Sequence, residues 1–130
     1  MRLFVTETPD GGWDELTDGG VPPVRVAAKD LQHARRVRAR VRAAGDVAVI
    51  LDVTVAVAAD FRSVRDVLEP AEGVRYAGTI DGLAGLIADI ESAGVADGVT
   101  LVPASPHGDV HSLGRAVLDR LASRAQAKAS

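Results

Sequence analysis

The sequence predicts an α/β domain in which a mostly parallel sheet alternates with helices. The first observation is a twelve-residue stretch, 47–58, that is rich in β-branched residues and contains neither glycine nor proline, as expected of a strand. The second is that shorter apolar runs of strand length alternate with amphipathic segments of helix length. Such alternation is typical of parallel sheets with right-handed crossovers. A chain of 130 residues fits one such domain.

The central stretch has two different faces. Its odd positions are all bulky, as expected beneath a layer of helices, and its even positions are small or polar, apart from Ile50. Apolar residues on both faces favour a central parallel strand that is covered on both sides. Asp52 and Thr54 then lie where a polar group needs a partner, a ligand or solvent.

The N-terminal part, residues 1–29, is predicted to hold two short strands, 3–6 and 24–27, joined by a long loop at 7–23 that is rich in acids, glycine and proline. So long a loop in a small domain is expected to be functional or mobile. Its acidic residues fit no calcium-loop spacing, so we expect no metal there. Trp13 is expected to fold back as an anchor.

Residues 30–125 read as successive strand–helix units. Asp30 caps a helix that ends at Gly45, with an apolar stripe formed by Leu31, Ala34, Val37 and Val41. The arginines on its other face indicate either a phosphate contact or a solvated surface, and we favour the second. A helix is predicted from Asp60 or Ser63 to the residues before Pro70. A strand at 74–77, a helix from Gly78-Thr79 to Gly94, a strand at 99–102 and a final helix from Val110 follow.

Composition excludes several classes of function. Hydrophobic residues make up 47% and charged residues 25% of the chain, as in globular proteins of the aqueous phase. No run approaches the ~20 apolar residues of a membrane span, and no signal-peptide pattern is present, so no membrane partner is expected. The absence of cysteine fits a cytoplasmic protein. A net charge of −3 and only four aromatic residues argue against nucleic-acid binding.

The second half of the chain is similar to a known family. A Gly-Thr helix start at Gly78-Thr79, an Ala-Gly turn at Ala93-Gly94, an Ala-Asp-Gly turn at 96–98 and a strand ending in Pro103 resemble the last strand–helix units of luciferase-like monooxygenases, in particular the nitrilotriacetate monooxygenase branch. Residues 34–59 are similar to the preceding unit. The resemblance covers roughly residues 30–125 and less than half of a typical member.

The resemblance implies half of a (β/α)8 barrel, because a whole barrel needs ~250 residues. Members use reduced FMN or a deazaflavin to oxidise small substrates with oxygen. Their flavin-phosphate loop, which contains glycine and serine, would fall at Ala27-Ala28-Lys29-Asp30, where neither residue is present and Asp30 would repel a phosphate. We therefore expect no cofactor for the isolated chain, and FMN or a deazaflavin only if the family activity is retained.

Sites in such sheets form at the carboxyl ends of strands, and this gives five candidate residues. Gly78 and Thr79 could hold an anion on backbone N–H groups, although a tight turn with a capping threonine is favoured. The loop Ser105-Pro106-His107-Gly108-Asp109-Val110-His111 carries two histidines and a serine. His107 and His111 would share a metal only if the helix began early, and exposed loop side chains are favoured instead.

Asp52 is the remaining catalytic candidate, because a buried carboxylate often has the raised pKa that suits acid–base work. An ion pair with Arg25 or Arg75 on a neighbouring strand is the favoured alternative.

Three hypotheses follow for the whole chain. The first is a flavin- or deazaflavin-dependent oxidoreductase subunit, completed by a second copy or by a complementary half-barrel chain. The second is a truncated, non-catalytic relative whose open sheet face is covered by a homodimer partner or binds a small ligand; small residues at Ala48, Ala56 and Ala58 would allow close approach. Exposed edges and faces predict an oligomer in both cases. The third is an open flavodoxin-like sheet with another strand order.

Overall fold

The computed structural model describes residues 1–7, 12–57, 73–104 and 109–129, with only the backbone described for Val57 and residues 125–129. Its strands are β1 (Arg2–Val5), β2 (Asp14–Glu15), β3 (Pro23–Val26), β4 (Ala48–Val57), β5 (Arg75–Gly78) and β6 (Gly98–Pro103). Its helices are α1 (Leu31–Ala44), α2 (Ile80–Ser92) and α3 (Val110–Ala129). The helix predicted to begin at Asp60 or Ser63 lies outside the described residues, as does Ala58.

The strands form one sheet organised around β4, as the sequence predicts. The order is β2-β1-β6-β4-β3, and β5 also pairs with β4. All pairs are parallel except β1 with β2. β4 has ten residues and is long enough for two short neighbours along one edge: β3 pairs with residues 48–51 and β5 with residues 54–57.

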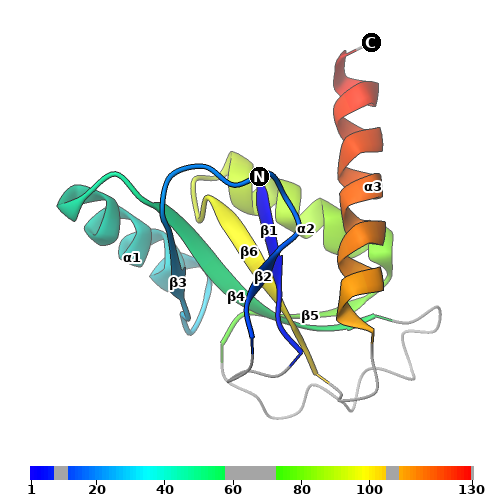
Figure 1. The fold of residues 1–130 in the computed structure, drawn as a ribbon, viewed down its shortest axis with the longest axis horizontal. Helices are drawn as coiled ribbons and strands as arrows, with labels where there is room; N and C mark the ends of the chain where they lie inside the picture. Colours follow the sequence, from blue (N-terminus) through cyan, green and yellow to red (C-terminus); the bar gives the residue numbers. More distant parts are fainter. Residues whose placement is uncertain (8–11, 58–72, 105–108, 130) are drawn as a thin grey trace.

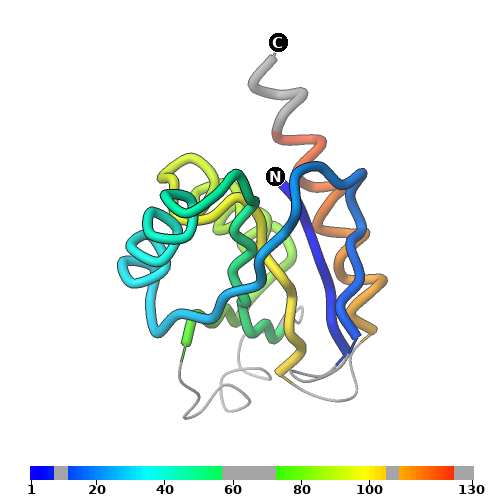
Figure 2. The backbone as a smooth tube through the Cα atoms, turned by 60° about the vertical axis from the view of Figure 1, so that its left-hand side comes forward, coloured from blue at the N-terminus to red at the C-terminus, as the bar shows by residue number. Residues whose placement is uncertain are grey.

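The α/β class with a mostly parallel sheet and alternating helices is therefore confirmed. The sheet curls, and the described helices lie around its outer side, so that it resembles half of a (β/α)8 barrel (Figures 1 and 2). The sequence left the strand order open. β6 lies between β1 and β4, so neighbours in the sheet are not neighbours in the chain, whereas strands of a closed barrel follow one another in chain order.

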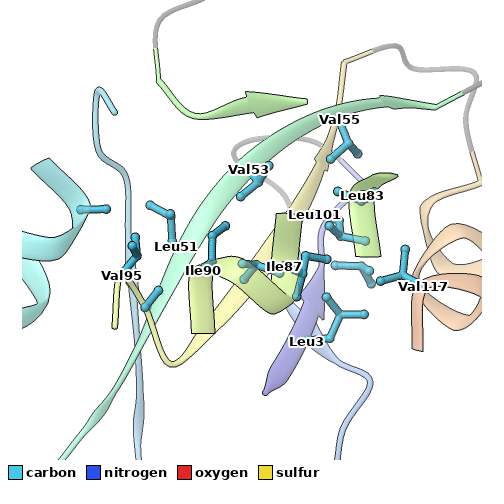
Figure 3. Packing of buried hydrophobic residues seen from close by; sticks show 14 of the residues in the cluster. Leu3, Leu51, Val53, Val55, Leu83, Ile87, Ile90, Val95, Leu101 and Val117 are labelled. Atoms are coloured by element: carbon cyan, nitrogen blue, oxygen red, sulfur yellow. The ribbon is translucent and has the colours of Figure 1, made fainter. Parts of the chain in front are cut away.

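The three described helices pack on one face of the sheet. That face is formed by the odd positions of β4, and it builds the main core. Figure 3 shows Leu83, Ile87 and Ile90 of α2 packed against side chains of β1, β4 and β6, with Val117 of α3 beside them. Leu3, Leu51, Val53, Val99 and Leu101 are fully buried in this layer. The bulky odd positions thus have the neighbours that the pattern predicts.

The opposite face differs from the prediction of helices on both sides. Among the described residues no helix lies on it, and its buried cluster is small, consisting of Phe4, Ala48 and Ile50 with Trp13 packed against them. We call this surface the helix-free face. An indole can bury a patch of this size because it is large and flat.

The region predicted as a loop at 7–23 contains a short strand. Asp14 and Glu15 pair antiparallel with Val5 and Phe4, and β2 thereby covers the outer edge of β1. The prediction failed because two residues give no period of their own. Their strand conformation is imposed by the edge of β1, which offers unpaired backbone groups.

Helix ends follow the local signals in the sequence. Asp30 caps α1 by accepting a hydrogen bond from the His33 N–H (2.7 Å), and Gly45 ends that helix. After α2, Gly94 has a positive φ of 69°. The Val95 N–H donates to Ile90 O (3.0 Å) and the Gly94 N–H donates to Glu91 O (3.1 Å), the two bonds of a Schellman motif.

Two helix details refine the predicted apolar stripes. Leu31 was placed on the buried stripe of α1, but 37% of it is exposed, and Ala34 is the buried residue. In α3, Gly114 permits close packing, since a Cβ there would overlap Leu16 and would lie 3.0 Å from Val5.

No helix in the described parts of the chain has the length and apolarity needed to cross a membrane.

Candidate functional site

Asp52 lies on the helix-free face, in the middle of β4. The Nε atom of Arg25 on β3 donates to its Oδ1 atom at 2.8 Å, and about a quarter of each side chain is exposed (24% and 23%). The two strands are parallel neighbours, with Arg25 opposite Ile50, so the pair reaches diagonally across adjacent strands. Asp52 was predicted to be either a catalytic carboxylate or the partner of an arginine on a neighbouring strand, and in the structure it forms an ion pair with Arg25.

Trp13 covers the helix-free face beside Asp52. Its ring stacks on Phe4 with centroids 4.2 Å apart, and its Nε1–H donates to the hydroxyl of Thr100 at 2.8 Å. Thr100 is fully buried and pairs with Asp52 in the register of β6 and β4. The indole N–H thus gives the buried Thr100 hydroxyl a hydrogen-bond partner. This contact and the stacking on Phe4 confirm that Trp13 is an anchor.

An ion pair borders the stacked rings. Arg2 donates from Nε and Nη2 to the two carboxylate oxygens of Glu15, at 2.8 and 2.7 Å, and its guanidinium lies over the Phe4 ring. The Thr17 hydroxyl also donates to Glu15 at 2.5 Å. The hydrogen bond from Arg2 is the main cause that lowers the pKa of Glu15. A forked contact of this kind fixes β2 against β1 rather than leaving a carboxylate available for acid–base work.

Toward the carboxyl end of the helix-free face the side chains become small. Ala56 of β4 pairs in register with Ala77 of β5, and Thr54 pairs with Arg75. Thr54, Ala56 and Ala77 are partly exposed and Arg75 is exposed. This part of the face therefore presents small residues, with the charged side chain of Arg75 beside them.

The second candidate, at Gly78 and Thr79, forms the N-terminus of α2. The Thr79 hydroxyl accepts a hydrogen bond from the Gly82 N–H (3.2 Å), as a capping residue does. Asp81 lies in the first turn, where its charge opposes the binding of an anion. These contacts agree with the capping interpretation of Thr79.

Tyr76 explains the glycines around this turn. Its hydroxyl donates to the carbonyl oxygen of Thr79 (2.8 Å). A Cβ built on Gly78 would lie 2.5 Å from that hydroxyl, and one on Gly82 would overlap it. The phenol therefore occupies the space beside the first turn of α2, and both glycines are needed to admit it.

The third candidate region is the start of α3. Asp109 caps the helix: Ser112 donates to it from its hydroxyl (2.8 Å) and its backbone N–H (3.1 Å), and these bonds lower the pKa of the Asp109 carboxyl. His111 Nε2 lies 3.3 Å from Asp14 Oδ2 on β2. His111 thus faces the edge of the sheet on the helix-covered side, away from Asp52.

Two candidates, Ser105 and His107, lie outside the described residues. Within the described ranges, no group of three or more His, Asp or Glu side chains is arranged to hold a metal ion. Asp52, Thr79 and His111 have separate partners: Asp52 pairs with Arg25 of β3, Thr79 caps its own helix α2, and His111 lies near Asp14 of β2.

Asp97 has more charged and backbone partners than any other carboxylate in the described ranges, and sequence reasoning missed it. Its Oδ2 accepts from the Val49 N–H (2.8 Å), and its Oδ1 accepts from Arg38 (3.0 Å) and Arg42 (3.1 Å). Burial raises the pKa of Asp97, but the hydrogen bond from Val49 and the two guanidinium groups together lower it below its ordinary value. Two arginines that had been placed on a solvated face therefore hold α1 to the sheet.

Comparisons with known proteins do not extend this picture. No protein-family model matches the chain, and no curated protein matches it significantly. The class that the fold defines is a curled α/β sheet with a helix layer on one side and a polar, partly exposed helix-free face on the other.

Proposed function

We propose that this chain is a truncated, non-catalytic relative of the luciferase-like monooxygenases, and that it functions as a homodimer. In the dimer, the helix-free face of one copy is covered by the same face of the second. The observation that carries the proposal is the one-sided sheet. Among the described residues, three helices bury one face, whereas only the Trp13 indole covers part of the other.

The contacts of the candidate residues support a structural role. Asp52 is paired with Arg25, Thr79 caps α2, and His111 is near Asp14. A general base or nucleophile must reach a substrate atom at hydrogen-bond distance. Each of these side chains instead has a partner within the chain, and the three lie at separate places.

The chemistry of the helix-free face fits a second copy of itself. Small residues at Ala56 and Ala77 let another backbone approach, and the face carries an acid, Asp52, between two bases, Arg25 and Arg75. In a two-fold contact the same patch meets itself, so the small residues of one copy would lie against those of the other.

The runner-up function is a flavin or deazaflavin oxidoreductase whose site is completed in the dimer or by a complementary half-barrel chain. The filled space beside the first turn of α2, where Tyr76 lies, favours the non-catalytic alternative. A chain without cysteine needs no oxidising compartment, which fits the cytoplasm.

The test is the mass of the purified chain by light scattering across a range of concentrations, combined with titration of FMN and of a deazaflavin. We expect twice the chain mass of 13.5 kDa and no flavin binding at millimolar concentration. Ala77→Arg should give a folded monomer, because the guanidinium blocks close approach. Gln32→Arg, an exposed change on α1, is the matched control and should remain a dimer.

Three outcomes would overturn the proposal. A monomeric mass at every concentration would refute the homodimer. A mass that stays dimeric in both Ala77→Arg and Thr54→Arg would show that the interface is not the helix-free face. Micromolar flavin binding by the dimer would replace the non-catalytic function with the flavin-dependent alternative.

A further inference from the structure

A groove on the helix side of the molecule lies between α2, α3 and the N-terminal residue. Its volume is about 420 Å³, within the range of small-molecule sites. Its walls are mainly apolar, formed by Met1, Ala88, Leu118, Leu121 and Ala122. Figure 1 shows that the C-terminal part of α3 extends beyond the sheet.

The charges around the groove are not balanced. The carboxylate of Glu91 is held by the α-amino group of Met1 at 2.7 Å. Arg124 also lines the groove, and within the described ranges no carboxylate is paired with it. Its guanidinium lies close to α2, with Nη1 3.9 Å from the position of a Cβ on Gly85. The uncompensated charge of this groove is therefore positive.

The positions of these residues along α2 give the groove a direction and a length. Gly85, which lies near Arg124, and Glu91, which binds the α-amino group of Met1, are six positions apart, which is about 9 Å along a helix. Ala88 lies between them along α2 and lines the groove together with Leu121 of α3. The groove thus has a cationic end, an apolar middle, and a far end where Glu91 is already neutralised.

We propose that this groove binds a medium-chain aliphatic carboxylate, with its carboxylate on Arg124 and its chain across Ala88 and Leu121 toward Met1. Charge complementarity selects the headgroup, because a guanidinium binds a carboxylate with two parallel hydrogen bonds. The apolar walls select an unbranched chain, and burial of each methylene contributes to binding. This site is independent of the helix-free face and does not rest on the proposed dimer.

The experiment uses the full chain and three probes of one length: octanoate, octanol and octylammonium. Binding is followed by calorimetry and by the methyl NMR signals of Leu118 and Leu121. We expect octanoate to bind most tightly and octylammonium least. Arg124→Gln should weaken octanoate binding about two- to fivefold, as expected for one exposed ion pair, and leave octanol unchanged. Arg40→Gln, an exposed arginine of α1, is the matched control.

A second variant tests the apolar part of the groove. Ala88→Phe fills part of the groove and should weaken octanoate and octanol alike. The dimer variant Ala77→Arg should bind octanoate as the wild type does, so that failure of the dimer and failure of this site are distinguished.

Three results would overturn the site: no binding of octanoate at millimolar concentration, equal affinities for octanoate and octylammonium, or an Arg124→Gln variant that binds octanoate normally. Shifts of the Leu118 and Leu121 signals that follow protein concentration instead of octanoate would show that a second copy occupies the groove.

Discussion

The Asp97 cluster gives the sharpest prediction about stability. Asp97 precedes β6, and its carboxylate binds the backbone of Val49 in β4 and two arginines of α1. Its backbone N–H also donates to Val49 O at 2.8 Å. One side chain thus joins a loop, the central strand and a helix that are far apart in the sequence. We expect Asp97→Ala to be the most damaging single substitution of a partly exposed residue.

The magnitude follows from the burial of each partner. Val49 is fully buried, so removing the acceptor leaves its N–H unsatisfied, which costs about 1–3 kcal/mol. The arginines are 28% and 43% exposed, and each such ion pair contributes at most about 1 kcal/mol. Asp97→Ala should therefore lower the free energy of unfolding by about 2–4 kcal/mol. Asp97→Asn keeps an acceptor for Val49 and should cost about 1–2 kcal/mol.

The pH dependence separates charge from hydrogen bonding. The folded-state pKa of Asp97 lies below the ordinary value of 3.8, so its contribution is present above pH 3.8 and is lost as pH falls through the folded pKa. The difference between wild type and Asp97→Asn should be full at pH 7 and shrink below pH 3.8. Urea unfolding at pH 7 and at several acidic pH values measures this difference.

Asp46→Asn is the matched control, because Asp46 is exposed, and it should change the unfolding free energy by less than about 0.5 kcal/mol. The reasoning would be refuted if Asp97→Ala were as mild as this control. It would also be refuted if the deficit of Asp97→Asn stayed constant from pH 7 into the acidic range.

Three further experiments test packing and polar contacts by urea unfolding. Gly114→Ala should lower the free energy of unfolding by about 1–3 kcal/mol, because the added methyl has no room. In the matched helix change Gly85→Ala, the methyl meets nothing closer than 3.9 Å, and the protein should become more stable by about 0.5–1 kcal/mol. A stabilising Gly114→Ala together with a destabilising Gly85→Ala would contradict the packing. Trp13→Phe loses one hydrogen bond and should cost about 0.5–1.5 kcal/mol, so an unchanged stability would argue against that bond. A double-mutant cycle on Asp52 and Arg25 should give a coupling free energy of about 0.5–1 kcal/mol. A coupling of zero would contradict an ion pair that stabilises the fold.

Features set by neighbouring residues could be predicted from the sequence. β4 follows from its composition, and the caps at Asp30 and Thr79 follow from a side chain that reaches an N–H three residues ahead. Gly94 ends α2 because a left-handed residue is needed there. Each signal lies within one or two turns of the structure that it specifies.

Features set by distant residues could not be predicted. The position of β6 between β1 and β4 is decided by pairing across the whole chain. β2 exists only because β1 offers an edge. Asp97 gave no signal because Arg38 lies 59 positions away and Val49 lies 48 positions away, and its Ala-Asp-Gly context reads simply as a turn. Even for Asp52 the sequence left two partners open, and only the strand pairing selected Arg25.

The residues that carry the family resemblance have local structural roles in this chain. Thr79 caps α2, Gly78 makes room for Tyr76, Gly94 closes the helix, and Asp97 joins three elements. Such roles arise wherever a parallel strand is followed by a helix, so these positions are needed for folding whether or not a cofactor binds. A flavin site in this chain would consequently have to be built outside this turn, with the helix-free face as its natural place. The Ala77→Arg variant therefore bears on both functions at once. If a flavin bound to the dimer, this substitution would remove dimer and flavin together. If the dimer is non-catalytic, it removes the dimer alone.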